Sequence, residues 1–227
     1  MTTASAFASS GGPNDPRFDQ NLEQNIKGGT RGNTNTYRAA TLFTRLGNGA
    51  PGVALIGTGY LIGRWSGNER LADASSLSAE ALLSSGLWVT GLKQILARTR
   101  PSGGGTGAFF QYHPDAGQQK GSFPSGHAIG AFTIATVFAE EYSDKKWVPW
   151  VMYGTAGAIA LSRVSLGRHY TTDVIAGAIL GNSIGRMVVA RQAESGGLNR
   201  RPLALSNFEP ILDPAKRVYG LGYSYSW

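Results

Sequence analysis

Three short clusters of residues could together bind a tetrahedral oxyanion and transfer a proton or a phosphoryl group. Between them they supply three fixed cations, two histidines, one carboxylate and a small-residue turn. In chain order the clusters are Lys93, Arg100 and Pro101; Pro124, Ser125, Gly126 and His127; and Ser162, Arg163, His169 and Asp173. Guanidinium and ammonium groups hold phosphate oxygens, and histidine can act as a nucleophile or a proton donor. The clusters therefore predict a phosphate site.

The middle cluster is a turn that leads into a predicted helix. Backbone N–H groups at the start of a helix bind anions. Ser125 can add a hydroxyl donor, and Gly126 lets an oxyanion approach the backbone. His127 would lie in the first turn of the helix and face the bound group. Taken alone, such a histidine is more often a satisfied polar residue than a catalyst.

The third cluster contains a histidine and an aspartate at a spacing of four residues. If a helix begins there, the carboxylate of Asp173 lies beside the ring of His169. An aspartate that accepts from one ring nitrogen fixes the tautomer and leaves the other nitrogen free as a nucleophile. Arg163 can supply a bidentate guanidinium to phosphate oxygens. The alternative interpretation is an ordinary ion pair on a helix.

The first cluster places two cations seven residues apart. On a helix this spacing is about 20° short of two full turns, so Lys93 and Arg100 would project from one face. A pair of this kind is weak evidence when it stands alone, because a solvated basic edge has the same pattern. Arg98 is interpreted as part of such an edge.

In this order the clusters match K-x6-RP, PSGH and SR-x5-H-x3-D, and over residues 93–173 the chain resembles the phosphatidic acid phosphatase type 2 and vanadium haloperoxidase superfamily. The resemblance implies that His169 attacks phosphorus and carries a phosphohistidine, that Asp173 orients it, and that His127 protonates the leaving alkoxide. It implies no metal or other cofactor. The phosphate oxygens would be held by Lys93, Arg100, Arg163, Ser125 and the N–H of Gly126.

The implied activity is a metal-independent phosphatase for phosphate monoesters, with lipid phosphates and pyrophosphates among the possible substrates. GSFPSGHA and SRVSLGRHYTTDV look like the soluble bacterial class A acid phosphatases, so that branch is favoured. One alternative is a vanadium-dependent haloperoxidase, in which His169 would coordinate vanadate. Vanadate would then be the cofactor, whereas it would inhibit a phosphatase. Another alternative is a non-catalytic anion-binding protein.

Composition limits the partners and the location. The 227 residues carry a formal net charge of +7, which favours anionic partners, but no basic run with interleaved aromatics indicates nucleic acid. There are no cysteines, which excludes disulfides and thiolate metal sites. No secretory signal is visible at the N-terminus. Met1 could begin a form whose leader was removed, and the expected location is then periplasmic or otherwise extracytoplasmic.

The expected architecture is an all-α bundle of about six main helices at residues 37–195. Residues 1–36 are expected to form a loose arm. One helix is predicted from Leu77 to Arg98, and its buried stripe would be Leu82, Leu83, Leu87, Trp88 and Leu92. Residues 102–123 form a Gly-rich connection that should lie over the site. Close helix–helix approach is predicted at Gly154, Gly157, Gly177, Gly181 and Gly185.

The remaining expectations concern the C-terminus and the membrane. In the extension at 196–227, aromatic and small residues alternate over 219–227, which predicts a strand. It would pair with residues 203–212 or with another subunit of a homo-oligomer. The apolar runs are interrupted by glycine and proline and fall short of about 20 predominantly apolar residues. No transmembrane span is therefore expected.

Overall fold

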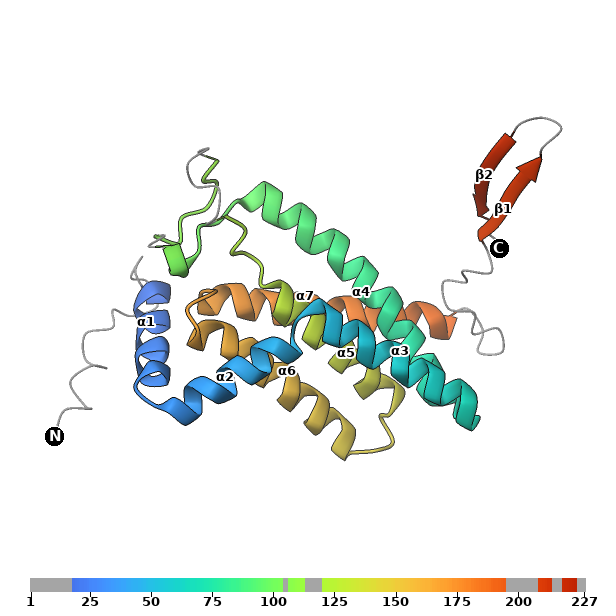
Figure 1. Cartoon of the computed structure of the whole chain (residues 1–227), viewed down its shortest axis with the longest axis horizontal. Coiled ribbons are helices and arrows are strands. Elements are labelled where there is room, and N and C mark those ends of the chain that lie inside the picture. The colour runs from blue at the N-terminus through green and yellow to red at the C-terminus, as the bar shows by residue number, and fades with distance from the viewer. Residues whose placement is uncertain (1–17, 104–105, 113–119, 195–207, 214–217, 224–227) are drawn as a thin grey trace.

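The computed structural model describes residues 18–103, 106–112, 120–194, 208–213 and 218–223, and within them the chain forms a helical bundle followed by a hairpin (Figure 1). The elements in chain order are α1 (Phe18–Arg31), α2 (Thr34–Leu46), α3 (Gly49–Ser66), α4 (Glu69–Leu96), a 3₁₀ turn (Pro101–Gly103), α5 (Gly126–Glu141), α6 (Trp147–Ser165), α7 (Thr171–Glu194), β1 (Phe208–Asp213) and β2 (Val218–Tyr223). The predicted all-α class is confirmed.

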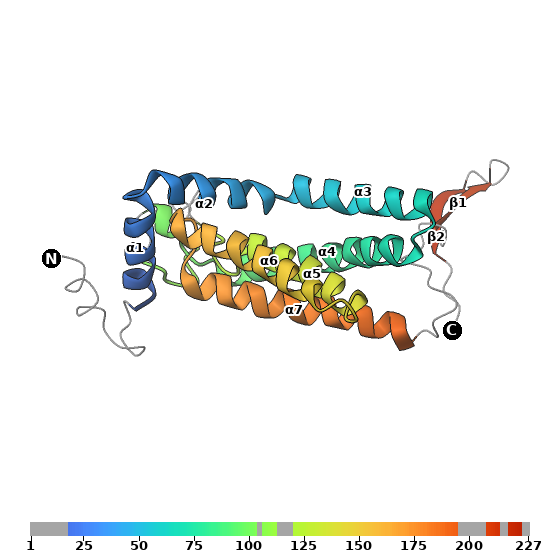
Figure 2. The same ribbon diagram turned by 90° about the horizontal axis from the view of Figure 1, so that it is seen from below.

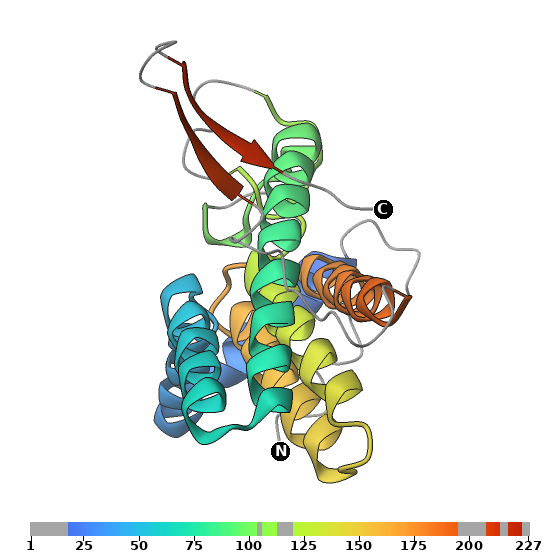
Figure 3. The same cartoon turned by 90° about the vertical axis from the view of Figure 1, so that its right-hand side faces the viewer.

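The long helices run roughly along one axis, and α5 is central, because it packs against α4, α6 and α7. Viewed down that axis, α3 and α7 lie on opposite sides of α4 (Figure 3). The helices α2 and α3 follow one another along one edge of the bundle, whereas α1 crosses its end (Figure 2). As a result, the loops between α4 and α5 and between α6 and α7 meet near α1.

Helix α1 lies within the segment that was expected to be a loose arm, so that expectation is wrong from Phe18 onward. The helix is anchored at its start, where Asp19 accepts hydrogen bonds from the side chain of Arg98 and the backbone of Thr172. These partners are about 80 and 150 residues away in the sequence, so local composition did not indicate them. Residues 1–17 lie outside the described residues.

The boundaries and the buried face of α4 also differ from the expectation. The helix begins earlier because the side chain of Asn68 caps it by accepting from the N–H of Leu71, and it ends at Leu96 because Ala97 takes a left-handed conformation with φ of 38°. The predicted buried stripe is wrong: Leu87 is 79% exposed and Trp88 is 59% exposed. The buried residues of α4 are Ala72, Ala74, Ser75, Leu77, Ser78, Ala81 and Ser85.

Small residues also decide how α5 and α7 pack. A Cβ at Gly181 would lie 2.4 Å from the carbonyl oxygen of Ile129, and one at Gly177 would lie 2.8 Å from that of Ser125. Gly185 is equally confined, so the prediction of close approach is confirmed for these three glycines. It is wrong for Gly154 and Gly157, where a Cβ would meet nothing within 4 Å.

The outward faces of the bundle are apolar. Large hydrophobic side chains are exposed on α3, α4, α6 and α7, and Trp65 at the end of α3 is 94% exposed. Within the described part of the chain, one helix segment, Thr171–Ala193, is long and apolar enough to cross a membrane by length and composition. Many buried positions thus carry small side chains, whereas large apolar side chains also cover the outside.

The C-terminal strands pair with each other in antiparallel order, with Phe208 opposite Tyr223 and Asp213 opposite Val218. The strand predicted at 219–227 is therefore present as Val218–Tyr223, and its partner overlaps the expected segment 203–212. Residues 224–227 lie outside the described residues.

Candidate active site

The residues of all three sequence clusters lie at the end of the bundle that α1 crosses (Figure 2). Each comes from a helix terminus or an adjoining loop. Lys93 lies near the end of α4, and its Nζ is 3.8 Å from the position of a Cβ on Gly126. Arg100 follows α4 and its Nη2 lies 3.4 Å from the carbonyl oxygen of Gly121. Both side chains lie next to Gly121 in the loop before α5. They do not project from one helix face, as the sequence suggested, because α4 ends between them.

His169 is buried between α6 and α7, with 2% of its surface exposed. Its Nδ1 lies 2.7 Å from the carbonyl oxygen of Ser122 and 3.6 Å from Oδ2 of Asp173. A carbonyl oxygen can only accept, so Nδ1 carries the hydrogen and Nε2 keeps its lone pair. The nearer orienting group is therefore the backbone of Ser122, which was not predicted from the sequence.

Burial lowers the pKa of His169 from its ordinary value, and the hydrogen bond and charge of Asp173 oppose that shift in part. The ring is therefore neutral at neutral pH. A neutral imidazole with a bound Nδ1 hydrogen is the form that can attack an electrophile through Nε2.

Asp173 is fully buried at the start of α7 and accepts hydrogen bonds from three residues besides its contact with His169. The hydroxyl of Ser122 donates to Oδ2 over 2.5 Å, and the backbone N–H of Tyr170 donates to Oδ2 over 2.9 Å. Arg98 donates from Nη1 to Oδ1 over 2.5 Å. This set of donors keeps the carboxylate ionised and fixed in place.

Arg98 is a buried member of the site and not part of an exposed basic edge, so the sequence interpretation was wrong. Besides Asp173 it donates to Asp19 over 2.7 Å and to the carbonyl oxygen of Gly107 over 2.9 Å. Its guanidinium also lies 4.4 Å from the centre of the Tyr170 ring. Arg98 thus links both α1 and the 102–123 connection to Asp173, the residue that contacts His169.

Three buried donor atoms of the predicted phosphate-binding residues have no hydrogen-bond partner among the described residues: the hydroxyl of Ser125 and the Nε atoms of Arg100 and Arg163. Burial, followed by the nearby charge of Arg168, lowers the pKa of Arg100 from its ordinary value. Unsatisfied buried donors are costly, and a bound anion would satisfy them. Lys93 lies beside Gly126, and Arg100 and Arg163 line one cavity, so these predicted phosphate-binding residues come from the same end of the bundle.

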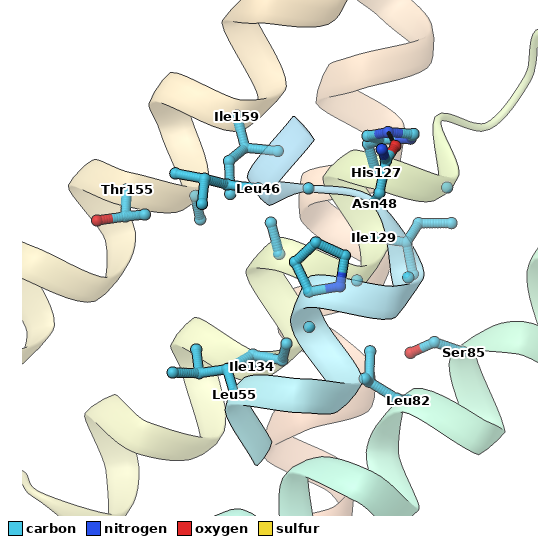
Figure 4. A pocket seen from close by; sticks show the side chains of 18 of the residues that line it. Leu46, Asn48, Leu55, Leu82, Ser85, His127, Ile129, Ile134, Thr155 and Ile159 are labelled. Atoms are coloured by element: carbon cyan, nitrogen blue, oxygen red, sulfur yellow. Dashed lines mark hydrogen bonds between the residues drawn. The ribbon is translucent and has the colours of Figure 1, made fainter. Parts of the chain in front are cut away.

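His127 lies in the first turn of α5, and its Nε2 is 2.9 Å from Oδ1 of Asn48 (Figure 4). Asn48 precedes α3 and was not predicted. It reaches the ring because Gly47 has no side chain: a Cβ there would lie 2.4 Å from Ile159 and 3.0 Å from His127. The turn between α2 and α3 therefore orients the second histidine.

Two cavities meet at His127 and Asn48. A polar cavity of about 570 Å³ contains Arg100 and Arg163. An apolar cavity of about 870 Å³ lies between α3, α4, α5 and α6, and the labelled side chains of Figure 4 surround it. Its lining includes Leu55, Leu82, Ile129, Ile134 and Ile159. A ligand could therefore place an anionic group among the cations and a hydrocarbon chain between the helices.

The described part of the 102–123 connection lies against the site, since Gly107 contacts Arg98 and Ser122 contacts both His169 and Asp173. Residues 104–105 and 113–119 of this connection lie outside the described residues. Among the residues that the structure describes, no group of three or more histidine, aspartate or glutamate side chains could hold a metal ion.

The family whose model matches the chain is the PAP2 superfamily, over residues 76–196. Lipid A 1-phosphatase of Porphyromonas gingivalis is 36% identical over 81 residues, which are 35% of this chain and 18% of that protein. Phosphatidylglycerophosphatase B of Bacillus subtilis is 35% identical over 100 residues, which are 40% of this chain and 44% of that protein. The matches thus span less than half the length of either curated relative.

Two solved structures share the fold. Aquifex aeolicus LpxE superposes with a TM-score of 0.60 at 23% identity, over 75% of this chain and 94% of that one. The first transmembrane PAP2 type phosphatidylglycerolphosphate phosphatase from Bacillus subtilis superposes with a TM-score of 0.58 at 24% identity, over 79% of this chain and 89% of that one. At these identities the likeness establishes the fold.

The prediction that no helix spans a membrane is wrong. The fold is shared with a transmembrane phosphatase, and the apolar faces of α3, α4, α6 and α7 point outward. Lipid stabilises such a surface, whereas large apolar patches are rare on soluble monomers. With 28 residues, α4 is about 42 Å long, enough for a hydrocarbon core of about 30 Å. In α4 most of the buried residues are alanine and serine, and such residues lower the average hydropathy of the helix.

Proposed function

Because this chain belongs to the PAP2 superfamily, we propose that it is a membrane phosphatase that hydrolyses phosphate monoesters of lipids. The observation that supports a lipid substrate is the junction of the polar and apolar cavities at His127 and Asn48. A phosphate among Arg100 and Arg163 would have its ester oxygen near His127. The hydrocarbon chain would then continue between α3, α4 and α5. The names of the curated relatives, both lipid phosphatases, point the same way.

In the proposed first step, Nε2 of His169 attacks phosphorus and the P–O bond to the lipid breaks as the P–N bond forms. His127 donates a proton to the departing alkoxide, which leaves as the alcohol. Lys93, Arg100 and Arg163 neutralise the charge on the remaining phosphate oxygens. The Ser125 hydroxyl, which has no partner among the described residues, donates to one of them.

In the second step a water molecule attacks the phosphohistidine and the P–N bond breaks. His127 takes a proton from the water, inorganic phosphate forms, and His169 returns to its neutral state. Asp173 and the carbonyl of Ser122 hold the imidazole in place throughout. The proposal requires no metal ion, because three cations supply the charge that Mg²⁺ supplies in other phosphoryl transfers.

We place the active-site end of the bundle at the extracytoplasmic surface of the membrane. This placement follows the extracytoplasmic location expected from the sequence, because basic residues lie at both ends of the bundle and do not choose between them. The cysteine-free chain allows a direct check by labelling Gln24→Cys and Lys146→Cys in intact cells with an impermeant maleimide. Only Gln24→Cys should react.

The function itself is tested by phosphate release from a dioleoyl phosphate monoester in neutral detergent micelles that contain a chelator. Glycerol phosphate serves as the water-soluble comparison. Rapid chelator-resistant release from the lipid, with inhibition by vanadate, is the expected result. Absence of release, or bromide oxidation by peroxide after vanadate loading, would contradict it.

A further inference from the structure

We propose that residues 109–112 insert into the interfacial layer of the membrane beside the active site. The partner of this surface is the boundary between lipid headgroups and acyl chains. The contact would be separate from the helix faces that lie against lipid chains, and it would hold residues 106–112 at the bilayer surface. The inference goes beyond the proposed function and does not require hydrolysis.

Residues 106–112 carry no charged side chain, and two of them expose large aromatic rings. Phe110 is 59% exposed and Tyr112 is 58% exposed. Water is a poor solvent for such rings, whereas aromatic side chains are common at membrane–water boundaries, where an apolar ring and a polar tip can both be satisfied. The composition of this segment therefore suits a lipid surface better than water.

The aromatic segment continues the apolar face of α4. The hydroxyl of Tyr112 donates to the carbonyl oxygen of Ile95, and the N–H of Phe110 donates to the next carbonyl along the helix over 2.8 Å. Ile95 is itself exposed, as is Trp88 two helical turns earlier on the same face. The segment is thus level with the last turn of α4, where a helix of 28 residues leaves a hydrocarbon core that about 20 residues can span.

The backbone of the segment is paired, which matters because unpaired N–H and C=O groups are costly in an apolar layer. The N–H of Gln111 donates to the carbonyl oxygen of Ala97 over 3.2 Å. The N–H of Thr99 donates to the carbonyl oxygen of Ala108 over 3.1 Å. The side chain of Gln111 also donates to the carbonyl oxygen of Phe109 over 3.2 Å. These bonds lower the cost of bringing the segment into the interface.

One ring of the segment packs against the protein while the next is exposed. Phe109 makes an edge contact with Phe123 at 5.4 Å between ring centres, and the guanidinium of Arg98 lies 4.8 Å from the centre of the Phe109 ring. Phe110 follows with φ of 60°, which is uncommon for a residue other than glycine. The proposed membrane contact would therefore adjoin Arg98, which holds Asp173.

Insertion is measured by depth-dependent quenching, which needs no turnover. The chain has no cysteine, so one fluorophore can be placed at a time. Phe110→Cys in the full chain is labelled with a nitrobenzoxadiazole maleimide in detergent and reconstituted into phosphatidylcholine vesicles that contain doxyl-labelled lipid. Doxyl near the headgroup should quench about twofold more strongly than doxyl near the chain end. Gly57→Cys, exposed in the middle of α3, should show the reverse order.

Thr106→Cys is the matched control within the segment, because Thr106 is exposed and its carbonyl oxygen accepts from Gln20 of α1. Its label should be quenched by iodide in the water and only weakly by doxyl lipid. Doxyl quenching at residue 110 no stronger than at residue 106 would overturn the inference. So would shielding at residue 110 that depends on the protein-to-lipid ratio and not on doxyl, because a second copy of this chain would then cover the rings.

A second measurement asks whether lipid holds the segment. In vesicles, Phe110→Asp should speed hydrogen exchange of residues 109–112 about tenfold, because it removes an apolar ring and adds a charge. Aspartate tolerates a positive φ better than phenylalanine, so backbone strain would not explain the change. Gln94→Asp adds the same charge at an exposed position in the last turn of α4 and should have no effect.

Unchanged exchange in Phe110→Asp would show that the segment is held by its own hydrogen bonds, and would overturn the inference. Because neither measurement involves phosphate release, an inactive wild type would count against the proposed function alone.

Discussion

Arg98 donates a hydrogen bond of 2.5 Å to Asp173, and through it the buried carboxylate is connected to helix α1. Arg98 is not among the described residues that line either cavity, so we expect its effect on the reaction to pass through Asp173 and the ring of His169. Arg98 is therefore a positioning residue.

Replacing Arg98 by methionine should lower kcat by about 10²-fold with little change in KM, because a small displacement of the attacking nitrogen is that costly. Arg98→Lys keeps the charge but not the forked geometry and should recover part of the loss. Phosphate affinity, measured by inhibition, reports whether the phosphate site is intact. Arg64→Met removes only a surface pair and is the control. Wild-type kcat in Arg98→Met would show that Asp173 needs no such support.

The pH dependence follows from the burial of His169. Because burial lowers the pKa of this histidine below 6.5, the ring stays neutral as the pH falls through that value. The reactive lone pair is lost only when the pH reaches the lowered pKa. The acid limb of kcat/KM should therefore lie below pH 6.5, once ionisation of the substrate phosphate has been subtracted. An acid limb at or above 6.5 would mean that a different group limits the reaction.

Packing between α5 and α7 should be sensitive to a single methyl group. Gly181→Ala places a Cβ against the carbonyl oxygen of Ile129, which can yield only by moving backbone, and should destabilise the bundle by about 1–3 kcal/mol. Gly154→Ala meets open space and is the matched control. It should stabilise slightly, since alanine favours a helix over glycine. Thermal unfolding in detergent compares the two, and equal midpoints would contradict the close approach.

The apolar cavity is tested by filling it. Gly86 and Gly91 both lie on α4 with open space at the Cβ position, but only Gly86 lines the cavity. Gly86→Leu should lower kcat/KM for a long-chain lipid phosphate roughly tenfold, equivalent to about two fewer buried methylene groups at about 0.8 kcal/mol each. A short-chain phosphate should be affected less than twofold. If Gly91→Leu has the same effect, the cavity does not hold the chain.

The sequence predicted the candidate site residues because their types and spacing suit phosphate binding and proton transfer. Lys93, Ser125, His127, Arg163, His169 and Asp173 were identified from residues within one segment, and the bundle brings them to one end. The orienting partners were missed for a physical reason. Ser122 acts on His169 through its backbone carbonyl, which every residue has, and Asn48 and Asp19 reach the site from distant helices.

The fold class could also be predicted, but not which helix faces are buried. The periodicity of Leu83, Leu87 and Trp88 was interpreted as a buried stripe because large apolar side chains face inward in water. In this bundle the small residues face inward and permit contacts such as that between Gly181 and Ile129. The same spacing has opposite meanings in water and in lipid, and the spacing alone does not identify the solvent.

The central claim is that His169 carries the phosphoryl group. The direct measurement is rapid mixing with a lipid phosphate labelled with ³²P, followed by an alkaline quench, which preserves phosphohistidine, and by peptide mass spectrometry. Wild type should show label on the peptide that contains His169, and the label should form and decay at rates that account for turnover. The His169→Asn variant should show neither label nor phosphate release. Turnover in that variant, or label on another residue, would contradict the account.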